Sequence, residues 1–376
     1  MSYLKIKRNI LLSPGPATTT DRVKQAQIVP DICPREKEFG DVMREIRQDL
    51  VKIAGGDTNY TSILFAGSGT SVMDATINSV VPPDKKILII NNGAYGERLV
   101  KIAEAYNISF VELKFEWGTK IELVKVKQIL EESSNIACLA VIHHETSTGI
   151  LNPIKEIGRI AKENDCVFIV DTISSFAGIP FSIKNCNIDF MMSTSNKCIQ
   201  GMAGIAFVIC RKDELEKTKD YPPRSFYLNL YSQYEYFEKK GQMRFTPPVQ
   251  VLYALKQAIK EFFEETAPNR YERYTKSYKV LTDGLKEMGF KFLLKDDVEH
   301  SHLLTTILKP DDPNFDFSVL HDKLYSKGFT IYPGKLKDKN TFRIANIGAI
   351  DHLDIKKFSK ELREVLGEMG VKLKRR

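Results

Sequence analysis

Several features that define common classes of protein are missing from the 376 residues of the sequence. No segment approaches the roughly 20 consecutive apolar residues that a membrane-spanning helix requires. The N-terminal stretch MSYLKIKRNILLSPGP contains no apolar run of signal-peptide length. We therefore expect no membrane partner and a cytoplasmic location.

Disulfide frameworks and zinc sites are not indicated either. The six cysteines, at positions 33, 138, 166, 186, 198 and 210, include no pair with CxxC spacing. Several lie in apolar segments, which is typical of buried thiols in a reducing compartment. The nearest approach to a metal cluster is His300-Ser301-His302 beside Glu299. Without further ligands nearby, this segment favours the polar start of a strand over a metal site.

The charge pattern does not indicate a nucleic-acid partner. The formal net charge is +7, but the positive residues are spread along the chain, and no basic run alternates with aromatic residues. The exception is the short basic end at residues 372–376, for which a solvated tail is favoured over a nucleic-acid contact. A mildly positive balance suits small anionic substrates.

The segments that are present indicate an α/β fold. Hydrophobic residues make up 43% of the sequence, enough for two domains or for one large domain with an appendage. Short, continuous apolar runs alternate with segments of helical length such as residues 154–164, as expected of strands covered on both faces. Such runs lie at residues 86–90, 139–142, 167–170 and 205–209. This alternation predicts a mostly parallel, doubly wound sheet that binds ligands beyond the carboxyl ends of its strands.

The pattern changes to that of an α+β unit after about residue 250. Helical patterns and apolar runs follow one another at residues 249–265, 274–288, 303–308, 317–324, 329–332 and 341–344. We expect a large α/β domain over residues 15–250 and a small α+β domain over residues 251–376, with residues 1–14 packed near the small domain. Pro247-Pro248 and Ala267-Pro268-Asn269 are the candidate junctions.

Three short segments place useful groups at the carboxyl ends of expected strands or at the start of a helix. Gly67-Ser68-Gly69-Thr70 precedes a helical pattern, and the N–H groups of a first helical turn form an anion site. Asp171 follows the apolar run at 167–170, and Lys197 follows a buried segment within STSNKCIQG (193–201). Each has a simpler alternative: a capped loop, a helix N-cap and a solvent-facing lysine, respectively.

Together, the three segments supply what pyridoxal 5′-phosphate (PLP) requires. A lysine amine forms a Schiff base with PLP once it has lost its proton, which burial and neighbouring cations favour. A carboxylate keeps the pyridine nitrogen protonated, and a helix N-terminus holds the phosphate. The phosphate loop, Asp171 and Lys197, in that order on a parallel sheet, therefore predict a PLP site without a metal.

The sequence also resembles the class V, fold-type I aminotransferases over nearly its whole length. The landmarks are LLSPGPATTT (11–20), GSGT (67–70), NNGAYGERL (91–99), HHETSTGILNPI (143–154), VDTISSFAGIP (170–180), STSNKCIQG (193–201) and RFTPPV (244–249). SNKCIQG (195–201), IYPGK (331–335) and FRIANIG (342–348) are narrower, and they resemble the members that use 2-aminoethylphosphonate as amino donor. The resemblance implies a large PLP-binding domain and a smaller α+β C-terminal domain.

The resemblance implies roles for individual residues. Lys197 matches the Schiff-base lysine, and Asp171 matches the partner of the pyridinium nitrogen. Arg343 matches the arginine that binds the substrate anion. Thr246 matches a threonine that reaches the cofactor phosphate of a neighbouring subunit, which implies a homodimer. The other expected cofactor contacts are Ser68, Gly69, Thr70, Tyr95, Thr146, Ser195 and Asn196. Tyr95 would stack on the cofactor ring, and a core tyrosine is its alternative.

The expected reaction is transamination between 2-aminoethylphosphonate and pyruvate, giving phosphonoacetaldehyde and L-alanine. A phosphonate has one more oxygen than a carboxylate, so we expect further donors from the backbone around Gly15 and from Arg35 or Arg244. Met243, where relatives often have an aromatic residue, and the segment DICPREKEF (31–39) depart from the pattern. These departures leave the amino donor open.

Two alternative functions follow. One is a class V transaminase for alanine or serine with glyoxylate or pyruvate. The other is a non-catalytic PLP-binding protein, which is disfavoured because Lys197, Asp171 and Arg343 are all present.

Overall fold

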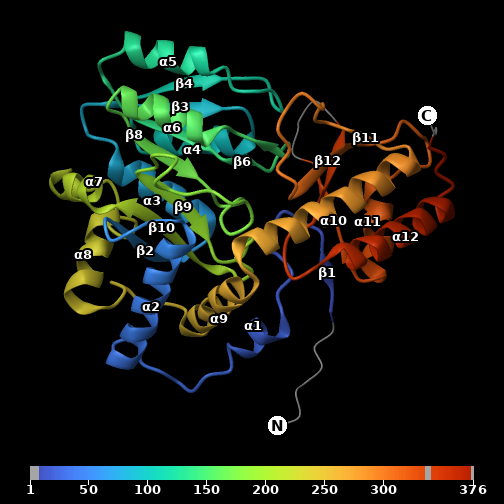
Figure 1. Cartoon of the computed structure of the whole chain (residues 1–376), viewed down its shortest axis with the longest axis horizontal. Helices are drawn as coiled ribbons and strands as arrows, with labels where there is room; N and C mark the ends of the chain where they lie inside the picture. The colour runs from blue at the N-terminus through green and yellow to red at the C-terminus, as the bar shows by residue number, and fades with distance from the viewer. Residues whose placement is uncertain (1–7, 335–339, 374–376) are drawn as a thin grey trace.

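A seven-stranded sheet forms the centre of the larger of two units in the computed structural model, which describes residues 8–334 and 340–373 (Figure 1). In spatial order its strands are β2 (Tyr60–Gly67), β10 (Gly204–Arg211), β9 (Phe190–Thr194), β8 (Val167–Asp171), β5 (Ile136–Ile142), β3 (Lys86–Asn91) and β4 (Phe110–Lys114). β10 runs antiparallel to both of its neighbours, and the other neighbouring pairs are parallel. The expected mostly parallel sheet is therefore confirmed.

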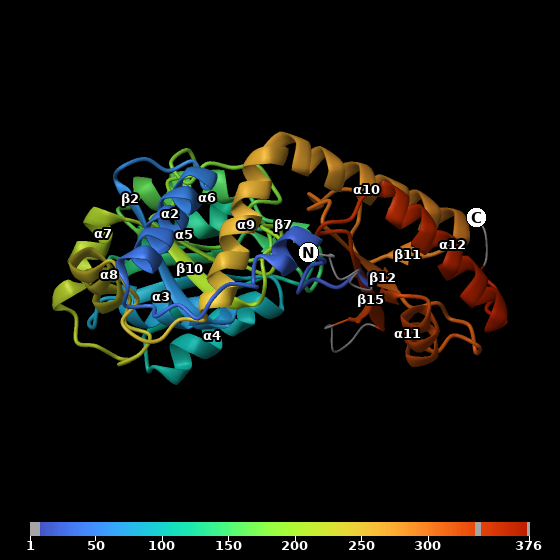
Figure 2. The ribbon, with the colours of Figure 1, turned by 90° about the horizontal axis from the view of Figure 1, so that it is seen from below.

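Helices cover both faces of this sheet. Figure 2 shows α2 (Lys37–Ile53), α6 (Ile154–Glu163) and α9 (Val249–Glu265) on one side, and α3 (Gly69–Val80) and α4 (Ala94–Ala105) on the other. The larger unit also contains α1 (Asp21–Gln25), α5 (Leu123–Glu132), α7 (Lys212–Lys217) and α8 (Leu230–Lys240). Because both faces are covered, β5 and β10 are buried along nearly their whole length, which explains their continuous apolar runs.

The smaller unit is a four-stranded antiparallel sheet with three helices. Its strands, in spatial order, are β11 (Lys291–Phe292), β12 (Leu304–Leu308), β15 (Thr341–Ala345) and β14 (Tyr332–Pro333). Its helices are α10 (Ala267–Met288), α11 (Phe317–Ser326) and α12 (His352–Glu368). A separate hydrophobic core joins these elements, and Leu281, Phe342 and Phe358 are among its fully buried members. The α+β texture read from the sequence after residue 250 corresponds to this unit.

The two ends of the larger unit show how the units are connected. β1 (Ile10–Leu11) pairs in parallel with β13 (Phe329–Thr330), and the Leu12 N–H donates to the Thr330 carbonyl, so residues 10–12 lie against the smaller unit, while residues 1–7 lie outside the described part. Most buried side chains of α9 belong to the core of the larger unit, although the expected boundary at 250/251 assigns most of this helix to the smaller one. The division into domains stays a prediction. Pro268 stands in the first turn of α10, where a missing N–H is tolerated.

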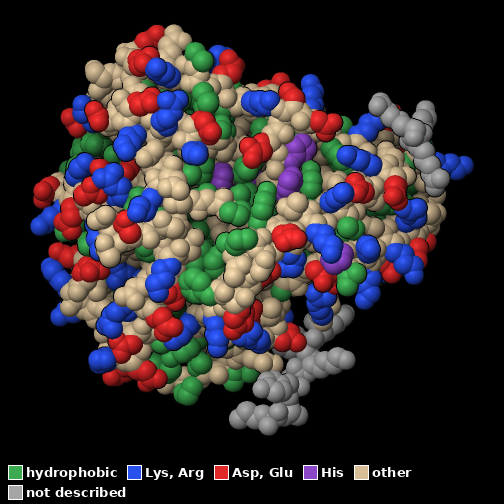
Figure 3. Space-filling model, in the orientation of Figure 1, with side chains coloured by type: hydrophobic (Ala, Val, Ile, Leu, Met, Phe, Trp, Pro, Cys, Tyr) green, Lys and Arg blue, Asp and Glu red, His purple; other side chains and the backbone are tan. Residues whose placement is uncertain are grey.

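The surface carries charges of both signs. Figure 3 shows Lys and Arg side chains interspersed with Asp and Glu over one face. Within residues 8–334 and 340–373, no helix combines the length and the apolar character needed to cross a bilayer. Residues 374–376 of the basic end, and Lys335 of IYPGK, lie outside the described residues.

Candidate functional site

The candidate site lies where parallel strands of the larger sheet end. β2, β3, β5, β8 and β9 point the same way, so the segments that follow them meet at one edge. A pocket of about 470 Å³ opens there. Six of the expected site residues line it: Ser68, Gly69, Thr70, Tyr95, Asn196 and Lys197.

The start of α3 forms one wall of the pocket. Ser68 is the N-cap residue with an extended backbone, and its side chain makes no capping hydrogen bond. The Ser71 N–H donates to the Ser68 carbonyl at 2.8 Å, so the Ser68 hydroxyl and the N–H groups of Gly69 and Thr70 remain for an anion. Gly69 lets Ile173 pack closely against the start of α3, since a Cβ there would lie 2.9 Å from Cδ1 of Ile173. The geometry is that of a phosphate-binding helix start.

Lys197 projects from the loop that follows β9. Its Nζ donates a hydrogen bond of 2.5 Å to the carbonyl oxygen of Pro14. The next residue, Gly15, has φ +141°, and a Cβ at this position would lie 2.3 Å from Nζ. The amine is therefore held between the sheet and the N-terminal SPGP segment, and the alternative of a solvent-facing loop lysine does not describe it.

The other residues of the lysine loop have structural roles as well. The Ser195 hydroxyl donates to the carbonyl oxygens of Met202 and Ile205, so it fixes the loop and is not among the described residues that line the pocket. Asn196 lines the pocket, and its backbone carbonyl accepts the N–H of Ala17 at 2.9 Å. A cofactor contact for Ser195 stays a prediction.

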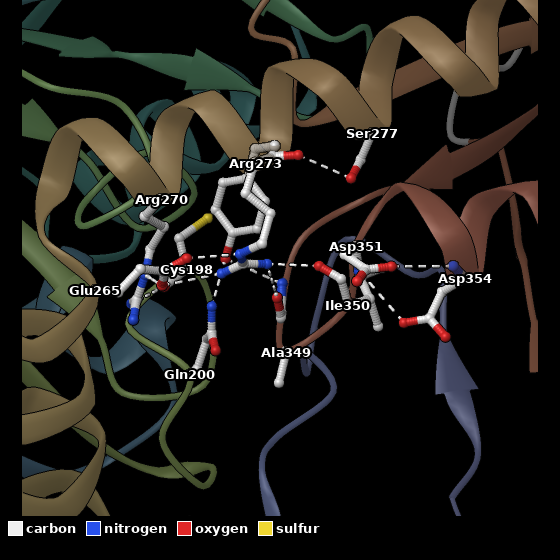
Figure 4. A network of polar contacts seen from close by, with 12 residues as sticks. Cys198, Gln200, Glu265, Arg270, Arg273, Ser277, Ala349, Ile350, Asp351 and Asp354 are labelled. Atoms are coloured by element: carbon white, nitrogen blue, oxygen red, sulfur yellow. Dashed lines mark hydrogen bonds and ion pairs between the residues drawn. The ribbon is translucent and has the colours of Figure 1, made fainter.

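A buried polar network anchors this loop to α10 (Figure 4). Arg270, only 1% exposed, donates from Nη1 to the Cys198 carbonyl at 2.9 Å and pairs with Glu265 at 2.6 Å. Gln200 donates to the Tyr274 hydroxyl at 2.7 Å, and that hydroxyl also accepts the N–H of Gly348 at 3.1 Å. The residues beside Lys197 are therefore tied to the segment that follows β15.

Asp171 is a buried carboxylate at the end of β8. Its Oδ1 accepts the N–H of Ile173 at 2.8 Å, and the side chain is 3% exposed. Burial raises the pKa of Asp171 to about 7, while the positive charges of Arg98 and Lys197 act in the opposite direction. A further cation against this carboxylate, such as a protonated pyridine nitrogen, would keep it ionised at neutral pH. The alternative role of Asp171 as a helix N-cap explains its contact with Ile173 but not the burial of its charge.

Glu145 is a site residue that sequence reasoning missed. It is fully buried, and its Oε2 accepts the N–H groups of Tyr95 at 3.1 Å and Gly96 at 3.2 Å. The carboxylate thereby fixes the start of α4 and the position of Tyr95. Burial raises the pKa of Glu145, and these hydrogen bonds oppose the shift. HHETSTG contains this glutamate, but no spacing rule distinguishes it from an exposed one.

Arg343 brings a cation from the smaller unit to the same edge. It lies on β15, is 1% exposed, and donates from Nη1 to the Thr146 carbonyl at 3.1 Å and from Nε to the Pro333 carbonyl at 3.0 Å. Burial lowers the pKa of Arg343, and the nearby oxygens of Tyr95 and Glu145 oppose that shift. A buried guanidinium at the junction of two units suits a small substrate anion.

Two buried polar atoms in this region have no hydrogen-bond partner within the described parts of the chain. They are Oγ1 of Thr146 and Nε2 of His144. Burial lowers the pKa of His144 to about 4, so its imidazole is neutral. The cost of leaving such atoms unpaired is about 1–3 kcal/mol each, which indicates that a bound group satisfies at least one of them. An oxygen-rich, aromatic cofactor such as PLP fits this donor set, together with Lys197, Asp171 and the start of α3.

Three predicted residues lie apart from this pocket. Thr246 is exposed, and it is not among the described residues that line the pocket. Arg35 donates to the carbonyl oxygens of Met243 at 2.6 Å and Arg244 at 3.1 Å, and Arg244 donates to the Phe226 carbonyl at 3.0 Å. Arg35 and Arg244 therefore order the loop beside Thr246.

The histidine segment read from the sequence is not arranged as a metal centre. His300 contacts the Tyr278 hydroxyl through Nδ1 at 2.9 Å and the Lys295 carbonyl through Nε2 at 3.0 Å. Across residues 8–334 and 340–373, no three His, Cys, Asp or Glu side chains are grouped as metal ligands.

Comparisons with known proteins agree with this geometry. The family described as Aminotransferase class-V matches residues 24–320. A 2-aminoethylphosphonate–pyruvate transaminase from Phocaeicola vulgatus is 42% identical over 360 residues, covering 95% of this chain and 98% of that protein. A bifunctional phosphonoacetaldehyde hydrolase/aminoethylphosphonate transaminase from Clostridioides difficile is 41% identical over 93% of this chain, which spans 55% of that protein.

A solved structure has the same fold. The alanine–glyoxylate aminotransferase from Nostoc sp. superposes with a TM-score of 0.88 at 25% identity, over 97% of both chains. The fold-type I architecture expected from the sequence is confirmed by this likeness. The chain therefore belongs to the class V aminotransferase family, whose cofactor is PLP.

Proposed function

We propose that this chain transfers the amino group of 2-aminoethylphosphonate to pyruvate, giving phosphonoacetaldehyde and L-alanine. The observation that carries the proposal is the near full-length similarity to transaminases named for this pair, at 42% identity over 95% of the chain. The bifunctional relative supports it, since its name joins the transaminase to a phosphonoacetaldehyde hydrolase.

The residues in and around the pocket have separate tasks in this reaction. Bound PLP supplies an electron sink for the carbon that loses a proton. Ser68, Gly69 and Thr70 would hold the phosphate, Tyr95 and Thr146 would hold the ring, and Asp171 would hold the pyridine nitrogen. The Lys197 amine would hold the cofactor until the donor's amino group takes its place there, and the freed amine would then remove a proton from the carbon that bears that amino group. The same amine later returns a proton to the corresponding carbon of pyruvate.

Arg343 binds the anionic end of each substrate in turn. The phosphonate of the donor and the carboxylate of pyruvate both present a pair of oxygens to a planar guanidinium. Because the backbone of Pro14 and Gly15 lies beside Nζ of Lys197, the N–H of Gly15 is a candidate for the third phosphonate oxygen. Arg35 and Arg244 are assigned to loop ordering within one chain.

We further propose a homodimer whose sites are completed by the neighbouring subunit. The reason is the exposed position of Thr246, away from the pocket of its own chain. A cytoplasmic location is part of the same proposal, since free thiols, buried at every cysteine except Cys33, and small metabolites as substrates fit it.

The test measures the two half-reactions separately through the absorbance of the bound cofactor. 2-Aminoethylphosphonate should convert the cofactor faster than β-alanine, which has the same spacing between amine and anion but carries a carboxylate. L-Alanine and L-serine complete the donor series. Lys197→Ala should abolish turnover, and borohydride should fix the cofactor on Lys197 in the parent protein.

A second candidate function is transamination of L-alanine or L-serine with glyoxylate or pyruvate. It is favoured by the TM-score of 0.88 to an alanine–glyoxylate aminotransferase. If L-serine or L-alanine converts the cofactor while 2-aminoethylphosphonate is inert, this second function replaces the first. If borohydride fixes the cofactor on a lysine other than Lys197, the role of Lys197 is refuted for both candidate functions.

A further inference from the structure

Arg98 is a pocket residue that the motif-based assignment leaves without a role. It lies in α4, three residues after Tyr95, so both side chains project from the same face of the helix. Its side chain is partly buried and lines the pocket together with Ser68, Gly69, Thr70 and Lys197. A partly buried arginine that lines a pocket is expected to bind an anion or a hydrogen-bond acceptor.

The contacts of Arg98 all lead to expected cofactor contacts. Its Nη1 donates to the Thr70 hydroxyl oxygen at 3.1 Å. Its guanidinium carbon lies 4.7 Å from the centre of the Tyr95 ring, which is cation–π geometry. Its charge also favours the ionised form of Asp171. One side chain therefore connects the phosphate loop, the stacking aromatic residue and the buried acid.

Arg98 forms no ion pair in the described parts of the chain. No carboxylate there lies within ion-pair distance of it, and its one side-chain hydrogen bond there goes to a neutral hydroxyl. A guanidinium without an ion-pair partner beside a phosphate-binding helix start favours an anion with more than one negative charge.

We propose that Arg98 is a positioning residue for the cofactor phosphate, acting through Thr70 and through its own charge. Because Arg98 donates to the oxygen of Thr70, the hydroxyl hydrogen of Thr70 is directed elsewhere and is available to a phosphate oxygen. The guanidinium supplies the positive charge opposite the phosphate and braces the Tyr95 ring. The inference concerns the cofactor and not the amino donor, so it holds even if 2-aminoethylphosphonate proves not to be a substrate.

The test compares PLP with pyridoxal, which lacks the phosphate, as ligands of the full-length protein from which PLP has been removed. Arg98→Gln should weaken PLP binding about 10–100-fold and pyridoxal binding less than about threefold, as expected for the loss of a charge-assisted contact. Arg98→Lys keeps the charge but loses the planar fork, so its PLP affinity should fall only a few-fold. Dissociation constants come from absorbance titration.

Lys101 offers a matched control, since it is an exposed cation on the same helix, one turn further on. Lys101→Gln should leave both dissociation constants unchanged. Equal losses for PLP and pyridoxal in Arg98→Gln would overturn the proposal, because they indicate general damage to the site. Unchanged PLP binding would overturn it too. If Arg98→Gln does not fold, the PLP-to-pyridoxal affinity ratio of Arg98→Lys decides: a decrease supports the proposal, and no change refutes it.

Discussion

Lys197, the lysine that we propose as the Schiff-base residue, packs against a glycine from a distant part of the chain. The backbone of Gly15 lies where any side chain would collide with the Lys197 side chain, since a Cβ would be 2.3 Å from Nζ and 2.6 Å from Cδ. The φ of +141° at Gly15 is also unfavourable for other residues. LLSPGPATTT therefore shapes the lysine site, in addition to any contact with substrate.

Gly15→Ala should reduce turnover about 10–100-fold, because displacing Nζ by even 1 Å spoils its alignment with the reacting carbon. Binding of PLP should weaken less than turnover falls. Gly328→Ala is the control, since Gly328 also has a positive φ of +88°, but a Cβ added there would have no atom within 4 Å. Equal effects of both substitutions on kcat would mean that backbone strain, and not the lysine contact, is responsible.

Asp171 should make the stability of the cofactor-free protein depend on pH. Its pKa is raised to about 7 by burial, above the value of 3.8 for an exposed aspartate. The unfolded chain therefore releases this proton more readily, so the contribution of Asp171 to stability is full below about pH 4 and is lost as pH rises through about 7. The direction is opposite to that of a carboxylate stabilised by an ion pair.

Asp171→Asn should consequently stabilise the cofactor-free protein at pH 8 by about 2–4 kcal/mol and change it little at pH 4.5. Urea denaturation at both pH values measures the difference. The same variant should lose most of its turnover, because an amide does not keep the pyridine nitrogen protonated. A gain that is equal at the two pH values would show that burial of the charge is not its cause.

At the scale of helices and strands, the lysine loop depends on α10. Tyr274 is fully buried, and its hydroxyl accepts hydrogen bonds from Gln200 in the lysine loop and from Gly348 after β15. The hydroxyl therefore joins the loop that carries Lys197 to the segment that follows the strand carrying Arg343. Two donors therefore converge on this hydroxyl.

Tyr274→Phe leaves both donors buried without an acceptor and should destabilise the protein by about 2–4 kcal/mol in urea denaturation. It should also lower kcat, since the loop beside Lys197 loses an anchor. Tyr325→Phe removes a hydroxyl that lies on an exposed ring, 59% accessible, and should cost less than about 0.5 kcal/mol. A Tyr274→Phe protein as stable as Tyr325→Phe would contradict the anchoring role.

Hydrophobic periodicity in the sequence predicts the helices and strands better than it predicts how these elements contact one another. The helical pattern at 249–265 coincides with α9, and the apolar runs at 86–90 and 167–170 fall within β3 and β8. Burial on both faces produces such runs, so the sequence reveals these strands. The antiparallel direction of β10 leaves no trace in its composition, because a strand buried on both faces has the same apolar run in either direction.

The site was predictable to the extent that strand ends carry short motifs. Lys197, Asp171 and the GSGT loop follow strands or precede a helix, so their convergence follows from a parallel sheet. Glu145 and Arg98 act through backbone N–H groups and a neighbouring hydroxyl, which depend on three-dimensional positions that spacing does not encode. Ser195 shows the reverse case, since a residue that flanks the lysine is used to hold the loop.

At the scale of the whole molecule, an aromatic surface lies next to Thr246. Phe226 is 78% exposed and Tyr227 is 39% exposed, and both rings lie close to Phe245, with centroids 5.8 and 5.1 Å away. The Arg244 guanidinium lies over Phe226 and Phe245. Exposed phenylalanine, tyrosine and arginine side chains are enriched in protein interfaces. The Tyr227 hydroxyl donates to the carbonyl of Ala66 at 3.4 Å, beside the phosphate loop.

Phe226→Asp should therefore separate the proposed homodimer into monomers, because it places a charge where an apolar ring would be buried between subunits. Sedimentation velocity at micromolar concentration measures the change. The monomer should also retain PLP less well than the dimer, since Thr246 then no longer reaches the partner's phosphate. Val124 on α5 is equally exposed, at 78%, so Val124→Asp is the matched control and should leave the dimer intact. A Phe226→Asp protein that stays dimeric would exclude this surface from the interface, and a fully active monomeric parent protein would exclude the composite site.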